Sequence, residues 1–372
     1  MFTLFENANV YAPEPLGVKN VLVADRRIAW IGDGPLDLDA QLDVTRVDVG
    51  GDALIPGLID GHAHITGGGG EAGYGSSVPP QEAEVFLSAG VTSVVGLLGT
   101  DDCVRTTDQL VHTAYGLRAH GLSAWCYTGG YHLPPMTLTG SIRRDIVHLD
   151  PVIGFGELAI SDHRSSQPTR DEVLRVASEV HVAGLMTGKA GIVHFHLGDG
   201  ERGLALIREC LDSSEIPARV FHPTHVNRRA ALFEEALAIT ERGVVIDITA
   251  TPEEGPGMDE VPASRAVAAI LDSNIDRTRW TVSSDGGGCL PAFNEQGEVV
   301  GVDVGRPVTL WKLIATLLAD HPLEEILPGF TSNPASLLRL HHKGRIEVGA
   351  DADLNLIRDQ RIVATYAGGR AR

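Results

Sequence analysis

The chain has 372 residues, of which 43% are hydrophobic and 21% charged, a composition typical of globular proteins. Acidic side chains outnumber basic ones by 49 to 30, and a net charge of −19 repels phosphate backbones and anionic lipid headgroups. Because of this charge, we expect no binding to nucleic acid or to membrane surfaces. No run of 18 apolar residues occurs, so we expect no membrane-spanning segment. The length suits one large domain with a smaller one.

Short strands are predicted at both ends of the chain. Apolar and polar residues alternate in Val21–Ala24 and Arg27–Ile31, which is the period-two pattern of a sheet. Near the other end, two or three strand-like runs occur within GRIEVGADADLNLIRDQRIVATYAGGR. We therefore expect residues 1–54 and 340–372 to form one small β domain, beside a central unit of residues 55–339.

Between these ends, short apolar runs alternate with amphipathic stretches, which is the pattern of repeated βα units and a parallel sheet. The amphipathic stretches include Gln81–Ser88, Arg170–Val182, Arg229–Thr240 and Ser264–Ala269. The eight strand candidates are Leu58–Ile59, Ser93–Leu98, Ser123–Thr128, Val152–Ile160, Ile192–Phe195, Arg219–Phe221, Val244–Ile248 and Thr281–Ser284. They predict an α/β fold of the (β/α)8 TIM-barrel type. A doubly wound open sheet is the alternative, and it is disfavoured because no G-x-G-x-x-G motif follows the first strand.

Metal-ligating residue types recur where the predicted strands end, and a barrel enzyme keeps its chemistry at those ends. His62 and His64 follow the first strand two positions apart, so their imidazoles lie on the same face of an extended segment. Glu157 lies inside the apolar run VIGFGELAI, where a carboxylate is costly to bury unless it is paired or binds a metal. The full set, from the ends of five strands, is His62, His64, Glu157, His196, His225 and Asp285.

This set is typical of two divalent metal ions, most simply Zn²⁺, bridged by one carboxylate. His62, His64 and Asp285 would hold the first ion, and the two histidines after the fifth and sixth strands would hold the second. Two such ions lower the pKa of a shared water, so that hydroxide is available near neutral pH. Asp285 is expected to accept the proton of this hydroxide and to pass it to the leaving amine.

Nine sequence runs match one known family. They are PGLIDGHAHITGGGGEAG, AGVTSVVGLLGTD, SAWCYTGGYH, AISDHRS, HFHLGD, PTHVNR, VVIDIT, SSDGGG and GRIEVGADADLNLI. In these runs the chain resembles the isoaspartyl (β-aspartyl) dipeptidases of the amidohydrolase superfamily, and the four glycines before Glu71 are more specific than the metal ligands. The resemblance implies a binuclear zinc barrel, a small β-sandwich built from both termini, homo-oligomerisation, and hydrolysis of dipeptides that begin with a β-linked aspartate.

The same resemblance assigns residues to the substrate. Tyr131 is similar to the family tyrosine whose hydroxyl stabilises the developing oxyanion. Arg164 and Arg228 match the arginines that bind substrate carboxylates, for which the planar guanidinium is suited. Glu71 resembles the carboxylate that receives the α-ammonium group, and Thr100 is a further substrate-binding candidate.

The sequence departs from the family pattern at two positions. Family members bridge their metals with a carboxylated lysine, whereas this chain offers the shorter Glu157, preceded by one additional residue that is expected to bulge the strand inward. Lys189 is the rival bridge, but it precedes the fifth strand and so belongs to the wrong end of the barrel. The second departure is Cys289, where a substrate-binding serine is expected, and a thiol is a poorer hydrogen-bond partner than a hydroxyl.

Two other functions are weighed against the dipeptidase. Another amidohydrolase, acting on N-acyl amino acids or cyclic amides, remains open because of Glu157 and Cys289. A non-catalytic protein of the same fold is disfavoured because all six positions hold competent ligands. Four further histidines are expected to be structural, namely His132, His163, His194 and His222. His194 shares a face with His196, so it is also an alternative to that ligand.

The location is predicted from cysteine spacing and the N-terminus. The four cysteines are scattered without C-x-x-C spacing, which disfavours a disulfide framework and a thiolate zinc site. The N-terminus has no basic segment typical of a signal peptide. We therefore expect a cytoplasmic protein.

Overall fold

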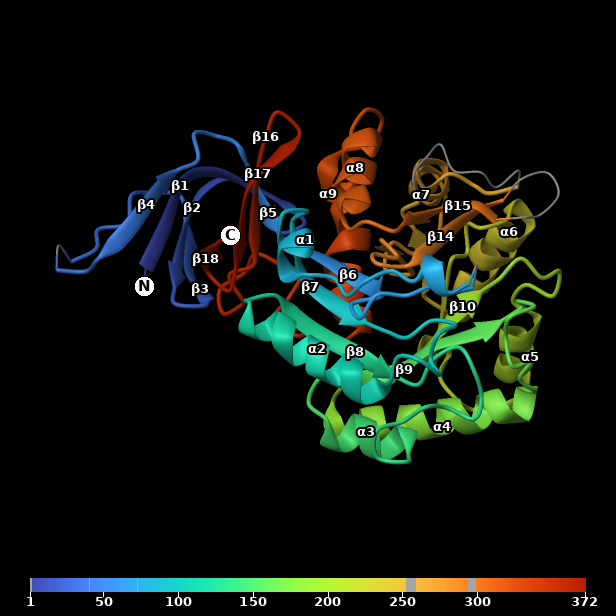
Figure 1. Cartoon of the computed structure of the whole chain (residues 1–372). Helices are drawn as coiled ribbons and strands as arrows, with labels where there is room; N and C mark the ends of the chain where they lie inside the picture. Colours follow the sequence, from blue (N-terminus) through green and yellow to red (C-terminus); the bar gives the residue numbers. More distant parts are fainter. Residues whose placement is uncertain (1, 40, 72, 252–258, 294–298) are drawn as a thin grey trace.

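The computed structural model describes residues 2–39, 41–71, 73–251, 259–293 and 299–372. Two large sheets of different construction lie side by side, one formed by the two ends of the chain and the other flanked by helices (Figure 1). The fold is of the α/β class, as predicted.

The central sheet is parallel and curled. Six of its strands are hydrogen-bonded in the order β11-β10-β9-β8-β7-β6, and β12 and β13 form a separate parallel pair. β12 packs beside β11 and β13 beside β6, so the sheet curls toward a ring. The strands are β6 (Leu58–Ala63), β7 (Val91–Gly96), β8 (Ser123–Thr128), β9 (Val152–Ile160), β10 (Val193–Leu197), β11 (Phe221–Thr224), β12 (Ile246–Thr249) and β13 (Trp280–Ser283). Each predicted strand overlaps an observed one, but the prediction Arg219–Phe221 is wrong for Arg219 and Val220, which belong to a 3₁₀ turn that precedes β11.

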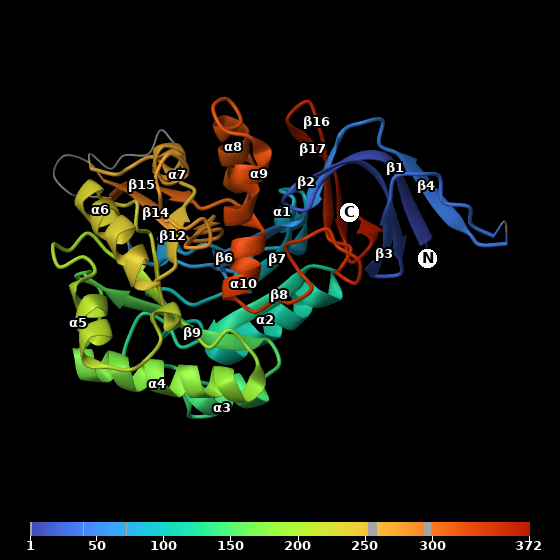
Figure 2. The same ribbon diagram turned by 180° about the vertical axis from the view of Figure 1, so that it is seen from behind.

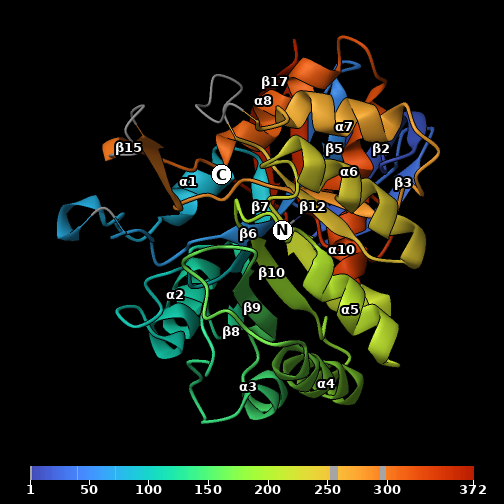
Figure 3. The same ribbon diagram turned by 90° about the vertical axis from the view of Figure 1, so that its right-hand side faces the viewer.

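Helices cover the outer face of this sheet, as Figure 3 shows for α2 to α7. They include all four predicted amphipathic stretches, now seen as α1, α4, α6 and α7. The α-helices are α1 (Ala83–Leu87), α2 (Thr107–Ala119), α3 (Ile142–His148), α4 (Arg170–Thr187), α5 (Ala205–Ser213), α6 (Ala230–Ile239), α7 (Ala263–Leu271), α8 (Val308–Leu317), α9 (Leu323–Ile326) and α10 (Ser332–Leu337). Short 3₁₀ turns are η1 (Tyr74–Ser76), η2 (Ala218–Val220), η3 (Thr240–Arg242) and η4 (Leu327–Phe330).

The longest of these helices, α4, has clear start and stop signals. Thr169 caps its first turn by accepting from the amide of Glu172, whose carboxylate accepts from the amide of Thr169 in return. Gly188 ends the helix in the left-handed conformation that favours glycine. Because the chain turns there, it re-enters the sheet as β10, between β9 and β11.

The second sheet joins the two ends of the chain (Figures 1 and 2). Its order is β18-β17-β16-β5-β1-β2-β3, with β4 paired to β1, and β5 bonds to β1 on one side and to β16 on the other. Its strands are β1 (Phe2–Tyr11), β2 (Pro15–Ala24), β3 (Arg27–Gly32), β4 (Val44–Asp48), β5 (Ala53–Pro56), β16 (Leu354–Arg358), β17 (Arg361–Ala367) and β18 (Arg370–Ala371). Its own hydrophobic cluster includes Val10, Leu54 and Leu356. The predicted pairing of the two ends is confirmed, and the domain boundaries stay a prediction.

An antiparallel hairpin of β14 (Cys289–Phe293) and β15 (Val299–Val304) follows β13. In the sequence, this hairpin connects β13, the last strand of the parallel sheet, to α8. The hairpin therefore borders the edge at which the predicted site residues gather.

Candidate active site

The ends of β6 and β13 are held together beside the first predicted ligands. The amide of His64 donates to the carbonyl of Gly286 across 2.7 Å, which brings the loop after β13 against the end of β6. Oδ1 of Asp285 consequently lies 3.3 Å from Nε2 of His62 and 3.2 Å from Nε2 of His64. The two imidazoles predicted to share a face thus meet the same carboxylate.

Glu157 lies in a bulge of β9. Phe155 is paired with Val193 and Leu158 with Phe195, so β9 advances three residues where β10 advances two. The additional residue predicted from the sequence is confirmed. A bulge bends its strand and re-aims a side chain, and here it includes the one acidic residue of β9.

The carboxylate of Glu157 contacts four histidines from three segments of the chain. Its Oε1 lies 3.6 Å from Nε2 of His64, and its Oε2 lies 3.5 Å from Nε2 of His62. The same Oε2 lies 3.3 Å from Nδ1 of His196 and 3.7 Å from Nε2 of His225. One carboxylate therefore stands between the two histidines at the end of β6 and two others, His196 in β10 and His225 directly after β11.

All six predicted ligands are brought together and buried. Their donor atoms form three overlapping groups in which every pair lies within 4.8 Å. The groups are His62 with His64 and Glu157, His62 with His225 and Asp285, and Glu157 with His196 and His225. A cluster that shares its members in this way can surround more than one cation.

The chemistry of the cluster fits divalent metal ions. Among the described residues, Nε2 of His62, Oε2 of Glu157 and Oδ1 of Asp285 are buried without a hydrogen-bond partner, which is costly for polar atoms. Burial alone would raise the pKa values of both carboxyls, but the neighbouring imidazoles outweigh it and hold them well below the usual range. Burial alone would lower the pKa of His62, but the two carboxylates outweigh it and raise the pKa to about 9. Buried nitrogen and carboxylate oxygen donors are the ligands that zinc prefers.

The rival bridge lies elsewhere. Nζ of Lys189 donates to the carbonyls of Ile146 and Leu149, both at 2.6 Å, on the segment that precedes β9. Lys189 itself precedes β10. Its ammonium group is therefore at the opposite ends of these strands from the cluster, as its sequence position predicts.

A second group of polar residues adjoins the cluster. The hydroxyl of Tyr131, after β8, lies 2.7 Å from Nδ1 of His196, and burial raises the pKa of this phenol well above its usual value. Nη1 of Arg164 donates to Oε1 of Glu71 at 3.0 Å. Its Nε and Nη2 donate to the two carboxylate oxygens of Asp162 at 3.0 and 2.7 Å. A protonated phenol, a fixed guanidinium and an acid thus face one edge of the cluster.

The other predicted substrate residues are joined less closely. Nη1 of Arg228 lies 3.2 Å from Nε2 of His196. Cys289 packs against Gly69, because a Cβ added at Gly69 would lie 2.8 Å from the Cβ of Cys289. Burial raises the pKa of the Cys289 thiol to about 11. Thr100 is half-buried after β7 and makes no hydrogen bond to the cluster within the described residues.

Sequence reasoning missed several residues of this site. Asp162, which binds Arg164 on both oxygens, stands in the run AISDHRS and could have been found as an acid beside a candidate arginine. Gly99 lies against the cluster, since a Cβ there would be 2.8 Å from Cε1 of His64, and no motif indicates it. His194, expected to be structural, places Nε2 at 2.8 Å from Nδ1 of His62.

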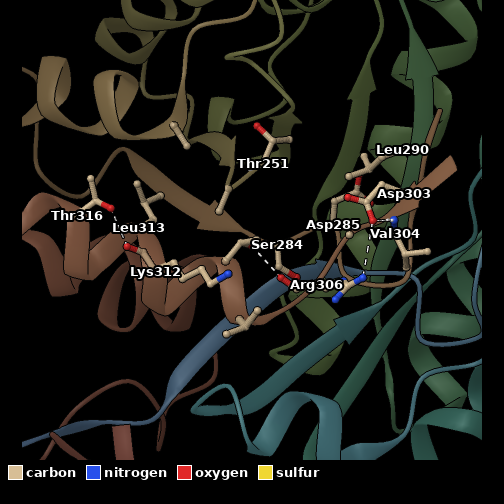
Figure 4. Close-up of a pocket in the computed structure, with 15 residues that line it drawn as sticks. Thr251, Ser284, Asp285, Leu290, Asp303, Val304, Arg306, Lys312, Leu313 and Thr316 are labelled. Atoms are coloured by element: carbon tan, nitrogen blue, oxygen red, sulfur yellow. Dashed lines mark hydrogen bonds and ion pairs between the residues drawn. The ribbon is translucent and has the colours of Figure 1, made fainter. Parts of the chain in front are cut away.

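A cavity of about 570 Å³ reaches the cluster at Asp285. Figure 4 shows Lys312, Leu313 and Thr316 projecting from α8 on one side of it. Asp285 lines the cavity and also contacts both imidazoles of β6. Asp285 is the only residue of the cluster that lines this cavity, and Glu71, Tyr131 and Arg164 lie outside its lining.

The sequence model of the Amidohydrolase family matches residues 53–372, and this chain belongs to that family. It is a hydrolase of the amidohydrolase superfamily. It is similar over 100% of its length to the crystal structure of a β-aspartyl dipeptidase of Fervidobacterium islandicum AW-1 in complex with β-Asp-Leu dipeptide, with 41% identity, a TM-score of 0.92 and 96% of that chain covered.

Curated relatives are more distant and carry other names. A deacetylase of Agrobacterium fabrum is 25% identical over 93% of this chain and 80% of that protein. An imidazolonepropionase of Paracoccus denitrificans is 27% identical, with 88% of this chain and 84% of that protein covered. In the described part of the chain, no helix combines the length and apolar character needed to cross a bilayer.

Proposed function

We propose that this protein hydrolyses the amide bond of isoaspartyl dipeptides with a binuclear metal centre. The observation that carries the proposal is the position of Glu157, whose carboxylate contacts histidines of both predicted metal sites. The full-length similarity to a β-aspartyl dipeptidase with 41% identity supports the substrate class.

Two zinc ions are proposed as the cofactor. His62, His64 and Asp285 would hold one ion. His196 in β10 and His225 after β11 would hold the other, and Glu157 would bridge the two ions. When bound, the two ions would supply a water that is activated near neutral pH and would polarise the scissile carbonyl.

The protein's own groups would then move the proton and stabilise charge. The carboxylate of Asp285 faces the cluster beside both His62 and His64, so it is placed to accept a proton and to deliver it to the leaving amine. Tyr131 keeps its proton because of burial, so its hydroxyl is a donor for the oxyanion. Both roles need only groups that already face the cluster.

The free groups of an isoaspartyl residue would be bound beside the cluster. Glu71 would receive the α-ammonium, and Arg164 with Arg228 would bind the carboxylates. Thr100 and Cys289 complete the proposed substrate contacts from neighbouring loops. In an isoaspartyl residue the α-ammonium and α-carboxylate are both free, whereas an α-linked aspartate has its α-carboxyl in the peptide bond.

We also propose a finer description of the whole molecule. The eight parallel strands would close into a (β/α)8 barrel of residues 55–339, which the packing of β12 on β11 and of β13 on β6 supports. The segments 1–54 and 340–372 would form a small β-sandwich. A homo-oligomer in the cytoplasm is the proposed working form.

The testing experiment is hydrolysis by the purified, zinc-loaded protein of a matched panel: β-Asp-Leu, α-Asp-Leu, N-acetyl-leucine and a cyclic amide. The proposal predicts turnover of β-Asp-Leu with kcat/KM well above that for the other three. Preference for N-acetyl-leucine or for the cyclic amide would contradict it. Those outcomes correspond to the alternative, an amidohydrolase acting on N-acyl amino acids or cyclic amides, which the deacetylase relative and Cys289 favour.

A further inference from the structure

A row of buried imidazoles leads from His62 into the interior of the parallel sheet. Nδ1 of His62 lies 2.8 Å from Nε2 of His194 in β10, and Nδ1 of His194 lies 2.9 Å from Nδ1 of His222 in β11. Nε2 of His222 in turn lies 3.2 Å from Oγ1 of Thr281 in β13. All four side chains are buried, and we call the three histidines the imidazole array.

The array ends at a buried carboxylate in β12. Asp247 accepts hydrogen bonds from the hydroxyls of Thr281 at 2.5 Å, Ser283 at 2.5 Å and Thr224 at 2.7 Å. An ionised carboxylate can only accept, so the hydroxyl hydrogen of Thr281 points to Asp247. The oxygen of Thr281 is therefore left as an acceptor toward His222.

This end fixes the direction of every hydrogen bond in the array. His222 must donate from Nε2 to Thr281, so a neutral His222 accepts at Nδ1. His194 must then donate from Nδ1 and accept at Nε2. His62 must finally donate from Nδ1 to His194, so the Nε2 atom of His62 makes no hydrogen bond within the array.

The row of contacts itself calls for neutral rings. A cationic imidazole donates from both nitrogens, so each of the two nitrogen–nitrogen contacts, at 2.8 and 2.9 Å, needs one ring that accepts. His62 therefore directs Nε2 toward Asp285 at 3.3 Å and Glu157 at 3.5 Å, inside the cluster.

We propose that the imidazole array, anchored by Asp247, keeps the proton of His62 on Nδ1 and thereby presents the Nε2 lone pair to the metal ion. His194 and His222 are positioning residues. They act through His62 and form no hydrogen bond with Glu157, with Asp285 or with the proposed substrate-binding residues. The array acts on one ligand: among the described residues, Nδ1 of His64 has no partner and Nδ1 of His225 meets only the hydroxyl of Thr249. The inference rests on the metal centre proposed above.

The first test measures the tautomers in the unmodified protein and uses variants of the array only to assign the signals. Histidine ring ¹⁵N shifts of the zinc-loaded protein report which nitrogen of each ring carries the proton, with signals assigned from His194→Gln and His222→Asn. We expect the proton on Nδ1 of His62 and His194 and on Nε2 of His222. A proton on Nε2 of His194, or a cationic His222, overturns the proposal.

The second test removes the anchoring hydroxyl and measures zinc affinity by competition with a chelator. Thr281→Val is expected to weaken the binding of one zinc ion by about 10- to 100-fold, the usual effect of losing a group that orients a metal ligand. Thr281→Ser, which restores the hydroxyl, is expected to bind zinc as the unmodified protein does. Ser283→Ala is the matched control, because it removes a hydroxyl from the same carboxylate without touching His222. Equal affinity of Thr281→Val and the unmodified protein, or an equal loss in Ser283→Ala, overturns the proposal.

The two proposals fail in different ways. If the protein binds two zinc ions and hydrolyses β-Asp-Leu but His194 has the other tautomer, the imidazole array is wrong and the proposed function stands. If the unmodified protein binds no zinc, the proposed function fails and the array has no metal ligand to orient.

Discussion

Arg164 and Glu71, which are 93 positions apart in the sequence, form an ion pair of 3.0 Å next to the metal-ligating cluster. Asp162 holds the guanidinium from the other side through two hydrogen bonds. A fixed cation beside a fixed anion is complementary to the adjacent α-ammonium and α-carboxylate of a β-linked aspartate. This relationship leads to the first prediction.

Substituting Glu71 by glutamine is expected to lower kcat/KM for β-Asp-Leu by about 10- to 100-fold, because a hydrogen bond to a charged group contributes about 1.5–3 kcal/mol. Zinc content should stay at the level of the unmodified protein, since Glu71 lies outside the cluster. Glu84→Gln, an exposed glutamate of α1, is the control and should leave kcat/KM unchanged. An unaltered kcat/KM in Glu71→Gln would remove this residue from substrate binding.

Arg228→Met should damage dipeptide turnover much more than it changes metal content. Its guanidinium approaches His196 at 3.2 Å, and methionine keeps the length of the side chain while removing the carboxylate-binding charge. The neighbouring Arg229→Met is a matched control, because the two side chains are similarly exposed at 27% and 29%. If steady-state kinetics are equally affected in both variants, Arg228 has no special role.

Asp285→Asn is expected to lower kcat by about 10²- to 10⁴-fold, the range over which general acid–base groups contribute. An amide keeps the shape of the carboxylate and one oxygen, so much of the bound metal should remain. The measurement is kcat alongside zinc content of the same sample. Unchanged turnover at full zinc content would exclude Asp285 from proton transfer.

Removing the metal should destabilise the fold. Zinc that binds only the folded protein stabilises it by about 2.7 kcal/mol when its free concentration is 100 times Kd. Treatment with a chelator is therefore expected to lower Tm by several degrees, and added zinc should restore it. In Glu157→Ala, which lacks the central carboxylate, zinc should raise Tm far less. The same zinc response in both proteins would argue against Glu157 as a ligand.

The sequence predicted the elements of this fold well because its patterns are local. The eight buried strands and the alternating strands at both ends are each encoded in the pattern of a few consecutive residues. Glu157 can be recognised in the same way, as an acid in an apolar run. The additional residue of β9 could be anticipated from the resemblance to the family, because the spacing before Glu157 departs from the family pattern.

The relationships between distant segments could not be predicted in this way. The contact of His194 with His62, and of Asp162 with Arg164 on both oxygens, depend on how neighbouring strands and loops are placed in three dimensions. Gly99 matters only because its missing side chain lets the backbone approach His64. Such proximity leaves no periodic signal in one sequence.

The most direct test of the metal centre is a crystal structure of the zinc-loaded protein with anomalous scattering at the zinc edge. We predict two anomalous peaks within the cluster, each bonded to one oxygen of Glu157, with Lys189 still paired to the carbonyls before β9. A single peak, or two ions joined by a group other than Glu157, would contradict the account.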